Sequence, residues 1–540
     1  MNLDKKNIFG IICVIIIISL GFKLFFIDFS TPFNSDNLGY LLRSFSHLNG
    51  NFDQHHDKGI GWSLFLSPFL TLIDSENILD YSNLVRVISL TISSSSIILF
   101  YFIARKFFDV KYSLIAISLY AFEPHLNYYS GIGLAEPFYL FILMASFFFA
   151  IQKQNHYIIP SLILAATSWW VRINGIGIIV LIGFIILISQ KRTSKNIGIF
   201  ILGIVISIIV ISPILIQREN QYDDPFYTSY SGKLFVENYD MLISKNVSEN
   251  NSASKYIEIY GIESFIEKFV IMGFFNTLTL LMKLCFPYLI FLFPIGVLFS
   301  IRAFDQKQEL ILANWIFILG NIILLLVILS NVPERRYLIF LIPFIIIIST
   351  IPIQRLIEYG LSTFSLSLKQ KNFFLLGIIC LVIIMSLSFS ISQYEKSNIS
   401  YENEKLELAK YVVNNLDGLV LDNNGDSFEY TSYVLSTTPH GDFKSVNNYN
   451  KKVSKVNPDF QTMDIYASSI DELITIGKDY ELKYIIVDKN SGFFHSYIKN
   501  IYENEDQYPY LKKIFDSEIE GMRYVKSKIF EINYDKFIFD

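Results

Sequence analysis

Long runs of apolar residues recur through most of this chain, and they constrain its fold more than any other feature. An α-helix of about 20 apolar residues crosses the hydrocarbon core of a bilayer. The first run covers residues 8–27. It is long for a signal peptide and lacks a small-residue cleavage site, so we expect an uncleaved first span. The other runs lie near residues 83–104, 112–129, 134–151, 157–171, 174–190, 197–216, 284–301, 310–330, 337–354 and 373–392. The sequence therefore predicts a multi-pass α-helical membrane protein with about 11 transmembrane helices.

Four of the apolar segments have a more specific interpretation. The runs at 157–171 and 174–190 are short and close together, which predicts a tight helical hairpin. Residues 62–73 and 262–282 are also apolar, and we expect them to form helices that lie in the membrane interface or pack on the bundle.

Composition agrees with the membrane class and excludes others. Of the 540 residues, 52% are hydrophobic and 17% are charged, whereas a soluble domain has about 25% charged residues. The net charge is −5 and no basic block is present, so we expect no nucleic-acid partner. The three cysteines lie singly inside apolar runs, which predicts neither a disulfide framework nor a cysteine-based metal site.

The charges between the apolar runs predict an orientation in the cell membrane. Positive residues collect in cytoplasmic loops. With a cytoplasmic N-terminus, the inner loops contain Arg105, Lys106, Lys111, Lys153, Lys191, Arg192, Lys195, Arg302, Lys307, Arg355, Lys369 and Lys371. An odd number of spans then places the C-terminal tail on the extracytoplasmic side, together with two outer loops at 28–82 and 217–283.

The chain is expected to contain two domains. Residues 1–392 would form the transmembrane domain, and residues 393–540, which are richer in charge, would form an extracytoplasmic soluble domain. Residues 406–415 have a helical pattern, and 418–422 and 484–488 are short apolar runs typical of buried strands. The tail is therefore predicted to be a small α/β domain.

Ionisable residues near the outer ends of the spans are candidates for chemistry, because such groups are costly at membrane depth. An acid, several cations and histidines at one interface would suit an anionic, lipid-linked substrate. The residues are Asp36, His55, His56, Asp57, Lys58, Glu123, His125, Glu136, Arg172, Arg218, Glu334, Arg335 and Arg336.

The order of these features resembles a known family. The segments are SDNLGY at 35–40, DKGIGWSLFLSPF at 57–69, the stretch 128–136 with YYS and LAE at its ends, VRINGIG at 171–177, and RYLIFLIP at 336–343. Together with the outer soluble domain, they resemble the GT-C membrane glycosyltransferases, within them the protein mannosyltransferase and aminoarabinose transferase-like branch. No single segment is specific, but their order, spacing and common sidedness are, and the resemblance covers most of the chain.

The resemblance implies a hexosyl- or pentosyltransferase that moves a sugar, with inversion, from a polyprenyl (dolichyl or undecaprenyl) phosphate to an acceptor. In this family the acid after the first span is the general base, which maps onto Asp36. A cation in the second half of the first loop stabilises the leaving phosphate, which maps onto Lys58. The acceptor is a protein, a lipid or a glycan.

Further substrate contacts are assigned mainly by their common side of the membrane. Arg172 and Arg335 or Arg336 are candidates for the phosphate. The other candidates for substrate binding are Tyr40, Asp57, Glu123, His125 and Glu136.

Metal dependence is not favoured. Relatives that use a diphosphate-linked donor have an Asp-x-Asp motif or a second nearby acid for a divalent ion, whereas Asn37 and Leu38 follow Asp36 here. We therefore expect no cofactor, with His55 and His56 as the weak candidates for a metal ion. Gly59 after Lys58 is another departure, since relatives have proline there.

Structural roles stand beside the functional ones. Asp36 is also a candidate helix N-cap, and Lys58 a candidate interfacial anchor. Arg172 is positioned for a salt bridge with Glu136 or Glu123, and one of the two arginines 335 and 336 for a pair with Glu334.

Three other functions remain open beside the transferase. They are a transporter or flippase of lipid-linked sugars, a glycan ligase or polymerase, and an inactive bundle whose tail recruits a partner.

Overall fold

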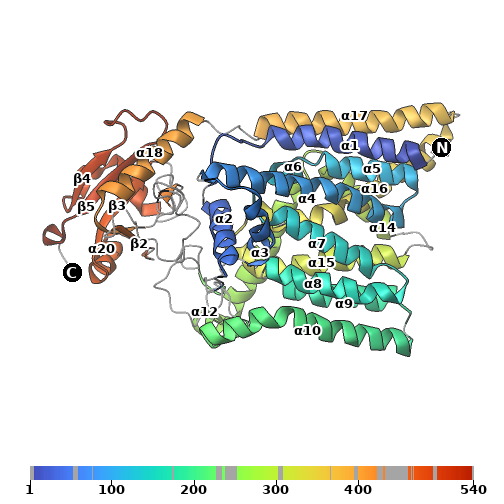
Figure 1. The fold of residues 1–540 in the computed structure, drawn as a ribbon, viewed down its shortest axis with the longest axis horizontal. Coiled ribbons are helices and arrows are strands. Elements are labelled where there is room, and N and C mark those ends of the chain that lie inside the picture. The colour runs from blue at the N-terminus through green and yellow to red at the C-terminus, as the bar shows by residue number, and fades with distance from the viewer. Residues whose placement is uncertain are drawn as a thin grey trace.

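The structure is a computed structural model of the full chain. It describes residues 5–33, 35–50, 52, 59–75, 77–172, 175–191, 193–226, 234–237, 252–301, 308–364, 367–393, 399–421, 430–431, 434, 460–463, 465, 467–489 and 496–537. A bundle of roughly aligned helices forms the larger part, and a smaller domain with a β-sheet lies beyond one end of it (Figure 1). The N-terminus lies at the opposite end of the bundle from this domain.

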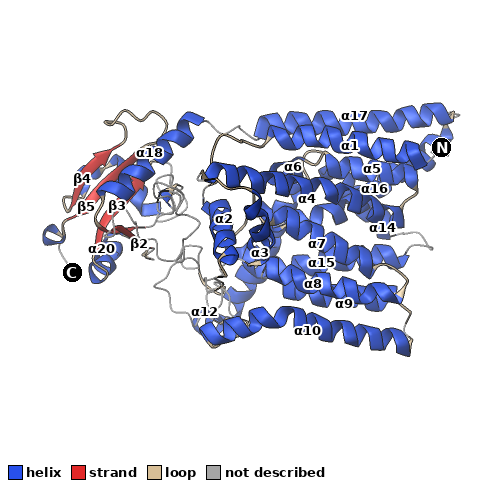
Figure 2. Cartoon of the chain, viewed as in Figure 1, coloured by secondary structure: helices blue, strands red, loops and turns tan. Residues whose placement is uncertain are grey.

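In the part of the chain that the structure describes, the bundle is built of helices joined by loops, and the strands lie in the C-terminal domain (Figure 2). The helices of the bundle are α1 (Lys5–Phe25), α2 (Ser35–Leu48), α3 (Gly61–Leu66), α4 (Ile78–Phe107), α5 (Val110–Ala121), α6 (Pro124–Tyr129), α7 (Glu136–Ala150), α8 (Ile158–Val171), α9 (Gly175–Ser189), α10 (Ser194–Tyr222), α12 (Ala253–Phe265), α13 (Gly273–Leu284), α14 (Leu289–Ile301), α15 (Gln308–Asn331), α16 (Ile342–Glu358) and α17 (Leu368–Gln393). The 3₁₀ turns η1 (Ser67–Leu72), η2 (Asn155–Tyr157), η4 (Arg335–Tyr337), η5 (Ile339–Leu341) and η6 (Gly360–Thr363) and the π-helical η3 (Ile266–Met272) join them.

Each apolar run predicted to span the membrane contains a helix. Among the described residues, seven helices have the length and composition to cross a bilayer: Lys6–Phe25, Ile78–Phe107, Ser194–Asn220, Ala253–Leu284, Gln308–Asn331, Arg335–Glu358 and Phe373–Gln393. The predicted spans at 112–129, 134–151, 157–171, 174–190 and 284–301 are helices of 12 to 15 residues. The multi-pass helical fold is confirmed, whereas length and composition support seven spans and not the predicted count.

Small residues bring neighbouring helices of the bundle close together. Ser146 of α7 and Ser161 of α8 donate hydrogen bonds to each other's carbonyl oxygens, both at 2.8 Å. Gly296 of α14 faces the backbone of Ile348 in α16 so closely that a Cβ atom there would clash. Close approach at glycine and serine is typical of helix packing in membranes.

The segment around residues 262–282 forms a helix that packs on α15. Asn276 of α13 donates a hydrogen bond to the carbonyl oxygen of Leu329 (3.1 Å), near the C-terminal end of α15. Gly261, with a φ of 85°, kinks the preceding α12, which lies at the end of the bundle near the C-terminal domain (Figure 1). The expected helix is therefore present, although the whole segment Ala253–Leu284 is also long and apolar enough to cross a membrane.

The C-terminal domain is an α/β unit, as predicted. Its elements are α18 (Ile399–Asn415), β1 (Gly418–Leu421), β2 (Phe460–Met463), α20 (Ile470–Asp479), β3 (Leu482–Asp488), η9 (Ser496–Ile498), α21 (Lys499–Glu503), η10 (Glu505–Gln507), β4 (Leu511–Asp516), β5 (Ser527–Ile532) and η11 (Tyr534–Lys536). The strand order is β2-β1-β3-β5-β4, with β1 parallel to β2 and β3, and β5 antiparallel to β3 and β4.

Alternation along β3 builds a core on both faces of this sheet. Ile485 and Val487 pack with α20, whereas Tyr484 and Ile486 pack with α18. Glu404 fixes α18 to the turn between β4 and β5, because its carboxylate accepts hydrogen bonds from the backbone N–H groups of residues 523, 524 and 525 (3.0, 2.7 and 2.9 Å).

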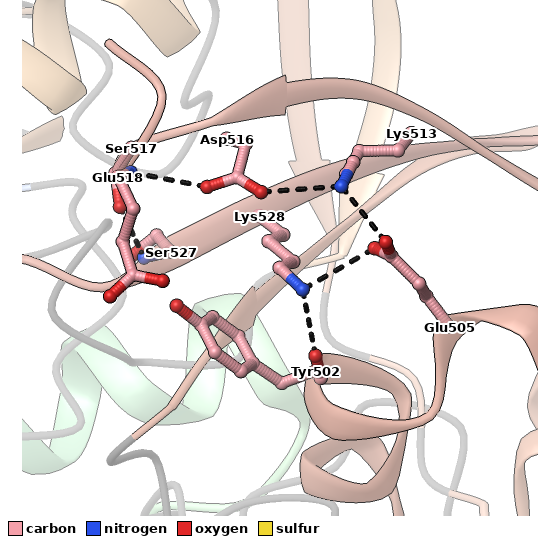
Figure 3. A network of polar contacts seen from close by, with 8 residues as sticks. All are labelled: Tyr502, Glu505, Lys513, Asp516, Ser517, Glu518, Ser527 and Lys528. Atoms are coloured by element: carbon pink, nitrogen blue, oxygen red, sulfur yellow. Dashed lines mark hydrogen bonds and ion pairs between the residues drawn. The ribbon is translucent and has the colours of Figure 1, made fainter. Parts of the chain in front are cut away.

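A polar network joins β4 and β5 to the helical turns beside them (Figure 3). Lys513 donates to Glu505 (2.9 Å) and to Asp516 (3.3 Å). Lys528 donates to the carbonyl oxygen of Tyr502 (2.8 Å) and forms an ion pair with Glu505 (3.3 Å). Both lysines therefore share the Glu505 carboxylate, which links β4 and β5 to the turn that contains Glu505.

Candidate functional site

Asp36 lies in the first turn of α2 and forms an ion pair with an arginine 300 residues later in the chain. Arg336 Nη1 donates a hydrogen bond to Asp36 Oδ2 at 2.8 Å. Arg336 Nε also lies 2.5 Å from Glu334 Oε2, so this guanidinium lies between two carboxylates. The side chains of Asp36 and Arg336 keep 30% and 26% of their surface exposed, so a substrate can reach them.

A second ion pair lies deeper and joins α7 to the end of α8. Arg172 Nη2 donates to Glu136 Oε1 at 2.8 Å, and the two side chains are only 15% and 6% exposed. The structural alternative for Arg172, a salt bridge with Glu136, is therefore present. The other carboxylate oxygen, Glu136 Oε2, is buried without a hydrogen-bond partner among the residues that the structure describes.

Tyr337 connects the two ion pairs. Its ring centroid is 5.5 Å from the guanidinium carbon of Arg172 and 5.5 Å from that of Arg336. A guanidinium within about 6 Å of an aromatic ring is attracted to it. The two arginines are thus held at one aromatic ring, one in the interior and one facing outward.

Tyr40 lies one helical turn after Asp36 and belongs to the same cluster. It is buried and interacts electrostatically with Glu136, Arg172 and Asp36. Burial, followed by the negative charge of Glu136, raises the pKa of the Tyr40 phenol. The Tyr40 hydroxyl therefore remains protonated at neutral pH and can donate a hydrogen bond.

A third group of polar side chains begins at α6. Glu123 is the N-cap of this short helix, and its Oε2 accepts from the backbone N–H of Leu126 at 2.6 Å. Glu123 Oε1 lies 2.8 Å from Nδ1 of His125. His125 Nε2 lies 3.5 Å from Nη1 of Arg335, whose side chain is exposed. Arg335 and Arg336 thus contact different partners, although they are neighbours in the sequence.

Sequence reasoning missed two buried cations near this site. Lys23 lies inside the first apolar run, in α1, and Arg43 lies on α2 with its guanidinium 6.0 Å from the Tyr40 ring. The signal for Lys23 was an ionisable residue at membrane depth. The signal for Arg43 was its helical spacing from Asp36 and Tyr40. Arg218, by contrast, stacks on Trp169 at 5.5 Å.

The candidates His55, His56, Asp57 and Lys58 lie outside the described residues. Gly59, which follows Lys58 in the sequence, lies against the carbonyl groups of Trp170 and Val171 so closely that a side chain has no room. The loop that contains Gly59 therefore approaches the chain just before Arg172.

No group of three histidine, cysteine, aspartate or glutamate side chains that could hold a metal ion occurs within the described part of the chain. Of the acids near the site, Asp36 is bound to Arg336, Glu136 to Arg172 and Glu123 to His125.

Comparison with known proteins gives one family match. Residues 58–216 match the family model described as dolichyl-phosphate-mannose-protein mannosyltransferase. A search of curated protein sequences gave no match.

Solved structures resemble nearly the whole chain. ArnT from Cupriavidus metallidurans bound to undecaprenyl phosphate has a TM-score of 0.54 at 10% sequence identity, and the match covers 98% of this chain and 99% of ArnT. The oligosaccharyltransferase of Archaeoglobus fulgidus in the apo form has a TM-score of 0.56 at 12% identity, covering 90% of this chain and 70% of that one. The same archaeal enzyme, AglB, in complex with an inhibitory peptide and a dolichol-phosphate, has a TM-score of 0.54 at 13% identity, covering 98% and 74%.

The protein is a membrane protein with the fold of the GT-C glycosyltransferases, and the resemblance predicted from the sequence is confirmed. Within that class it is similar to the protein mannosyltransferases over residues 58–216, and it shares the architecture of ArnT over almost its full length.

Proposed function

We propose that this protein is an inverting glycosyltransferase that moves a sugar from a polyprenyl-phosphate donor to an acceptor nucleophile. The observation that supports it is the arrangement around Tyr337. A partly exposed Asp36–Arg336 pair and a buried Glu136–Arg172 pair meet at one ring. Asp36 lies in the first turn of α2, a helix that lies at the end of the bundle near the C-terminal domain (Figure 1). Such an arrangement offers a base and fixed positive charge at the membrane surface.

The chemistry assigned to Asp36 is that of the general base. The acceptor hydroxyl oxygen attacks the anomeric carbon while Asp36 takes its proton, and the bond from the anomeric carbon to the phosphate oxygen breaks. The polyprenyl phosphate leaves with the bonding electrons, and the configuration at the anomeric carbon inverts. The ion pair with Arg336 supports this role, because it keeps the Asp36 carboxylate oriented before the substrate binds.

The charge that develops on the leaving phosphate needs cations that are already in place. Arg335 is exposed and lies next to Arg336 at η4, so both are candidates for contact with the phosphate. Lys58 also stays assigned to the leaving phosphate, as the sequence predicts. Arg172 is bonded to Glu136, which supports a role in orienting the site beside any contact with the donor.

Tyr40 and Glu136 are assigned to substrate binding. The Tyr40 hydroxyl is a donor, and the unused Glu136 Oε2 is an acceptor for a sugar hydroxyl. Asp57, Glu123 and His125 complete the set that the sequence placed at this end. A divalent ion is not part of the proposed reaction.

The lipid partner follows from the similar structures. ArnT was solved with undecaprenyl phosphate and the archaeal oligosaccharyltransferase with a dolichol-phosphate and a peptide. We propose the same class of lipid phosphate as the donor's carrier here, with a protein, lipid or glycan as acceptor. We also propose that residues 1–392 bind the donor in the bilayer, that residues 393–540 are extracytoplasmic, and that the N-terminus is cytoplasmic.

The test is transfer in detergent, where no second compartment exists, so that a transporter gives no product. The purified protein is incubated with a set of dolichyl- and undecaprenyl-phosphate sugars and with membrane extract as acceptor. We expect a radiolabelled sugar to be transferred by the native protein. Asp36→Asn is expected to lower the rate at least a hundredfold, as for removal of a general base.

Asp80→Asn is the matched control. Asp80 is an exposed acid at the start of α4 that accepts a hydrogen bond from Ser75 Oγ (2.5 Å), and among the described residues this bond does not involve the cluster around Tyr337. If Asp36→Asn transferred sugar as fast as Asp80→Asn, the base assignment would be wrong. If the native protein transferred none of the sugars, the transferase assignment would be wrong.

A further inference from the structure

Arg86 is a buried cation near the start of α4, and no step of the proposed reaction uses it. The residue is only 6% exposed. The sequence predicts that the loop before α4 is extracytoplasmic, and positive residues are uncommon on that side of a membrane. A buried charge is also costly unless its donors are bonded. The partners of Arg86 therefore indicate why this position has an arginine.

The Arg86 guanidinium binds the segment that leads from α1 to α2, here called the linker (residues 28–33). Arg86 Nη2 donates a hydrogen bond to the carbonyl oxygen of Thr31 at 2.9 Å. Arg86 Nη1 donates to Asn83 Oδ1, on the same helix, at 2.7 Å. The guanidinium carbon lies 4.7 Å from the centroid of the Phe33 ring, which is within the range of a cation–π interaction. Arg86 thus contacts both the backbone and a side chain of the linker.

Two other side chains of α4 bind the same linker. Asn83 Nδ2 donates to the carbonyl oxygen of Phe29 at 3.0 Å, and Ser82 Oγ accepts from the backbone N–H of Phe33 at 3.1 Å. Ser82 and Asn83 precede Arg86 by four and three residues, so all three lie on one face of the helix. This face of α4 therefore holds the linker at residues 29, 31 and 33.

Phe33 also packs against the loop between α6 and α7. Phe33 is 2% exposed, and a Cβ atom at Gly133 would clash with its ring. Gly133 has a φ of 81°, which glycine adopts readily, and its carbonyl oxygen accepts from Trp62 Nε1 at 3.0 Å. The end of the linker is therefore packed against a second element of the bundle as well as bonded to α4.

The position of the linker limits the position of Asp36. Asp36 follows Phe33 by three residues, so the chain allows at most about 11 Å between their Cα atoms. Asp36 lies in the first turn of α2 and pairs with Arg336 at 2.8 Å. A shift of Phe33 would therefore be transmitted to the Asp36 carboxylate.

We propose that Arg86 is a positioning residue for Asp36. By holding the linker on α4, Arg86 determines where α2 begins, and so aligns the Asp36 carboxylate with the acceptor hydroxyl. Arg86 acts through Asp36 and is assigned no contact with substrate. This inference rests on the proposed function, since it takes Asp36 as the general base.

The variant Arg86→Met removes the bond to Thr31 and keeps most of the side-chain volume. We expect kcat for sugar transfer to fall at least tenfold, because a displacement of about 1 Å can cost up to about a hundredfold in rate. The KM for the polyprenyl-phosphate sugar should change little, since the linker contains no candidate for the phosphate.

The matched control is Arg105→Met. Arg105 is an arginine of the same helix, and its Nη1 also donates to a backbone carbonyl oxygen, that of Phe108, at 2.7 Å. This contact lies at the other end of α4, so we expect native kinetics. The same kcat for Arg86→Met and Arg105→Met would overturn the proposal.

A double-mutant cycle separates positioning from a general loss of structure. In an Asp36→Asn background, Arg86→Met should cause little further fall in kcat, because its effect passes through the missing base. An equal fall in both backgrounds would show that Arg86 does not act through Asp36.

Ser82→Ala covers the case in which Arg86→Met folds poorly. It removes the oxygen that accepts from the Phe33 N–H, and we expect kcat to fall about threefold with little change in KM, as for loss of one hydrogen bond. The control is Ser118→Ala, a buried serine whose hydroxyl donates to the carbonyl oxygen of Leu114 in its own helix (2.8 Å). A kcat for Ser82→Ala as high as for Ser118→Ala would contradict the role of the linker.

Hydrogen exchange of the full chain in detergent tests the contact without any activity. Peptides that contain residues 28–40 should exchange faster in Arg86→Met than in Arg105→Met, while peptides from the C-terminal sheet exchange equally. If the native protein transfers no sugar, the proposed function fails and the catalytic part of this inference fails with it, but exchange still decides whether Arg86 holds the linker. If the native protein transfers sugar and residues 28–40 exchange equally in the two variants, this inference alone is overturned.

Discussion

The cluster around Tyr337 depends on the shape of the Arg336 side chain as well as on its charge. Its Nη1 donates a hydrogen bond to Asp36, its Nε lies 2.5 Å from Glu334 Oε2 in an ion pair, and its guanidinium carbon lies 5.5 Å from the centroid of the Tyr337 ring. A guanidinium can make these contacts together because its charge is spread over a planar group, whereas an ammonium is a single point charge.

We therefore predict that Arg336→Lys retains the charge and loses most of the activity. The value of kcat/KM for sugar transfer should fall at least tenfold, or about 1.4 kcal/mol. Steady-state kinetics in detergent measures this. Full activity in Arg336→Lys would mean that only the charge matters. The matched control is Arg355→Lys, which should remain active. Arg355 lies in the last turn of α16, with its guanidinium carbon 5.1 Å from the ring centroid of Tyr359.

The buried pair of Glu136 and Arg172 makes a different prediction, which concerns stability. Glu136→Gln leaves the Arg172 guanidinium buried without its counter-charge, and breaking such a pair typically costs about 3 kcal/mol. We expect a clear drop in melting temperature in detergent. The double variant Glu136→Gln/Arg172→Met should recover part of it, and a double variant no more stable than Glu136→Gln would show that the lost pairing is not the cause.

At the scale of a single element, α2 contributes several side chains to the cluster around Tyr337. Asp36, Tyr40, Arg43 and His47 follow one another at spacings of four, three and four residues, so they lie on one face of this helix. The same face therefore contains the partly exposed Asp36 at its start and a buried, neutral histidine at its end.

His47 gives α2 a predicted pH dependence. Burial, followed by the positive charge of Arg43, lowers the pKa of His47 to about 4. The unfolded chain binds a proton at His47 near pH 6.5. Its contribution to stability is therefore complete above pH 6.5 and is lost as the pH falls from 6.5 to about 4.

We expect the free energy of unfolding to decrease by about 1 kcal/mol between pH 7.5 and 5.5 because of this histidine. Melting temperatures across that range measure it, and His47→Phe, which preserves the ring contact with Phe52, should flatten the curve. His156→Phe is the control, since His156 lies in η2, far along the chain from α2. Equal slopes for the native protein and His47→Phe would contradict the assignment.

Much of α2 was not predicted from the sequence, and the reason is physical. The sequence identified Asp36 and Tyr40 through the segment at 35–40, but it treated 28–82 as a loop because its apolar content is low. An amphipathic helix at the membrane surface gives a weaker pattern than a continuous apolar span. The pairing of Asp36 with Arg336 was also missed, because a contact between residues so far apart leaves no local signal.

At the scale of the whole molecule, the sequence predicted the apolar spans and the α/β fold of the tail, but not the number of spans. Apolar runs such as 310–330 are unambiguous, and the strands at 418–422 and 484–488 were recognised as short buried runs. Helices of 12 to 15 residues such as α5 and α9 are shorter than a bilayer requires, so length cannot decide their role. The ion-pair partners of Arg172 and Arg335 depend on how the helices pack, which the charge pattern does not contain.

The arrangement of the two ends predicts a topology that can be measured. The N-terminus and the C-terminal domain lie at opposite ends of the bundle (Figure 1). With the loop charges, this predicts that an N-terminal tag is digested by protease only in inverted membrane vesicles, and a C-terminal tag only in right-side-out vesicles. Digestion of both tags in the same vesicles would show that the number of crossings is even.

The contact between Asp36 and Arg336 also has a consequence for how the protein is made. The two residues are 300 positions apart, and at about 5–20 residues per second a ribosome needs roughly 15 to 60 s to pass from one to the other. During that time α2 has already left the ribosome with its acid, while the arginine that pairs with it has not been synthesised. A nascent chain that stops before η4 lacks the Asp36–Arg336 pair, which we propose as part of the reaction centre. Catalytic competence would therefore be acquired late in synthesis, when most of the bundle is already in the membrane.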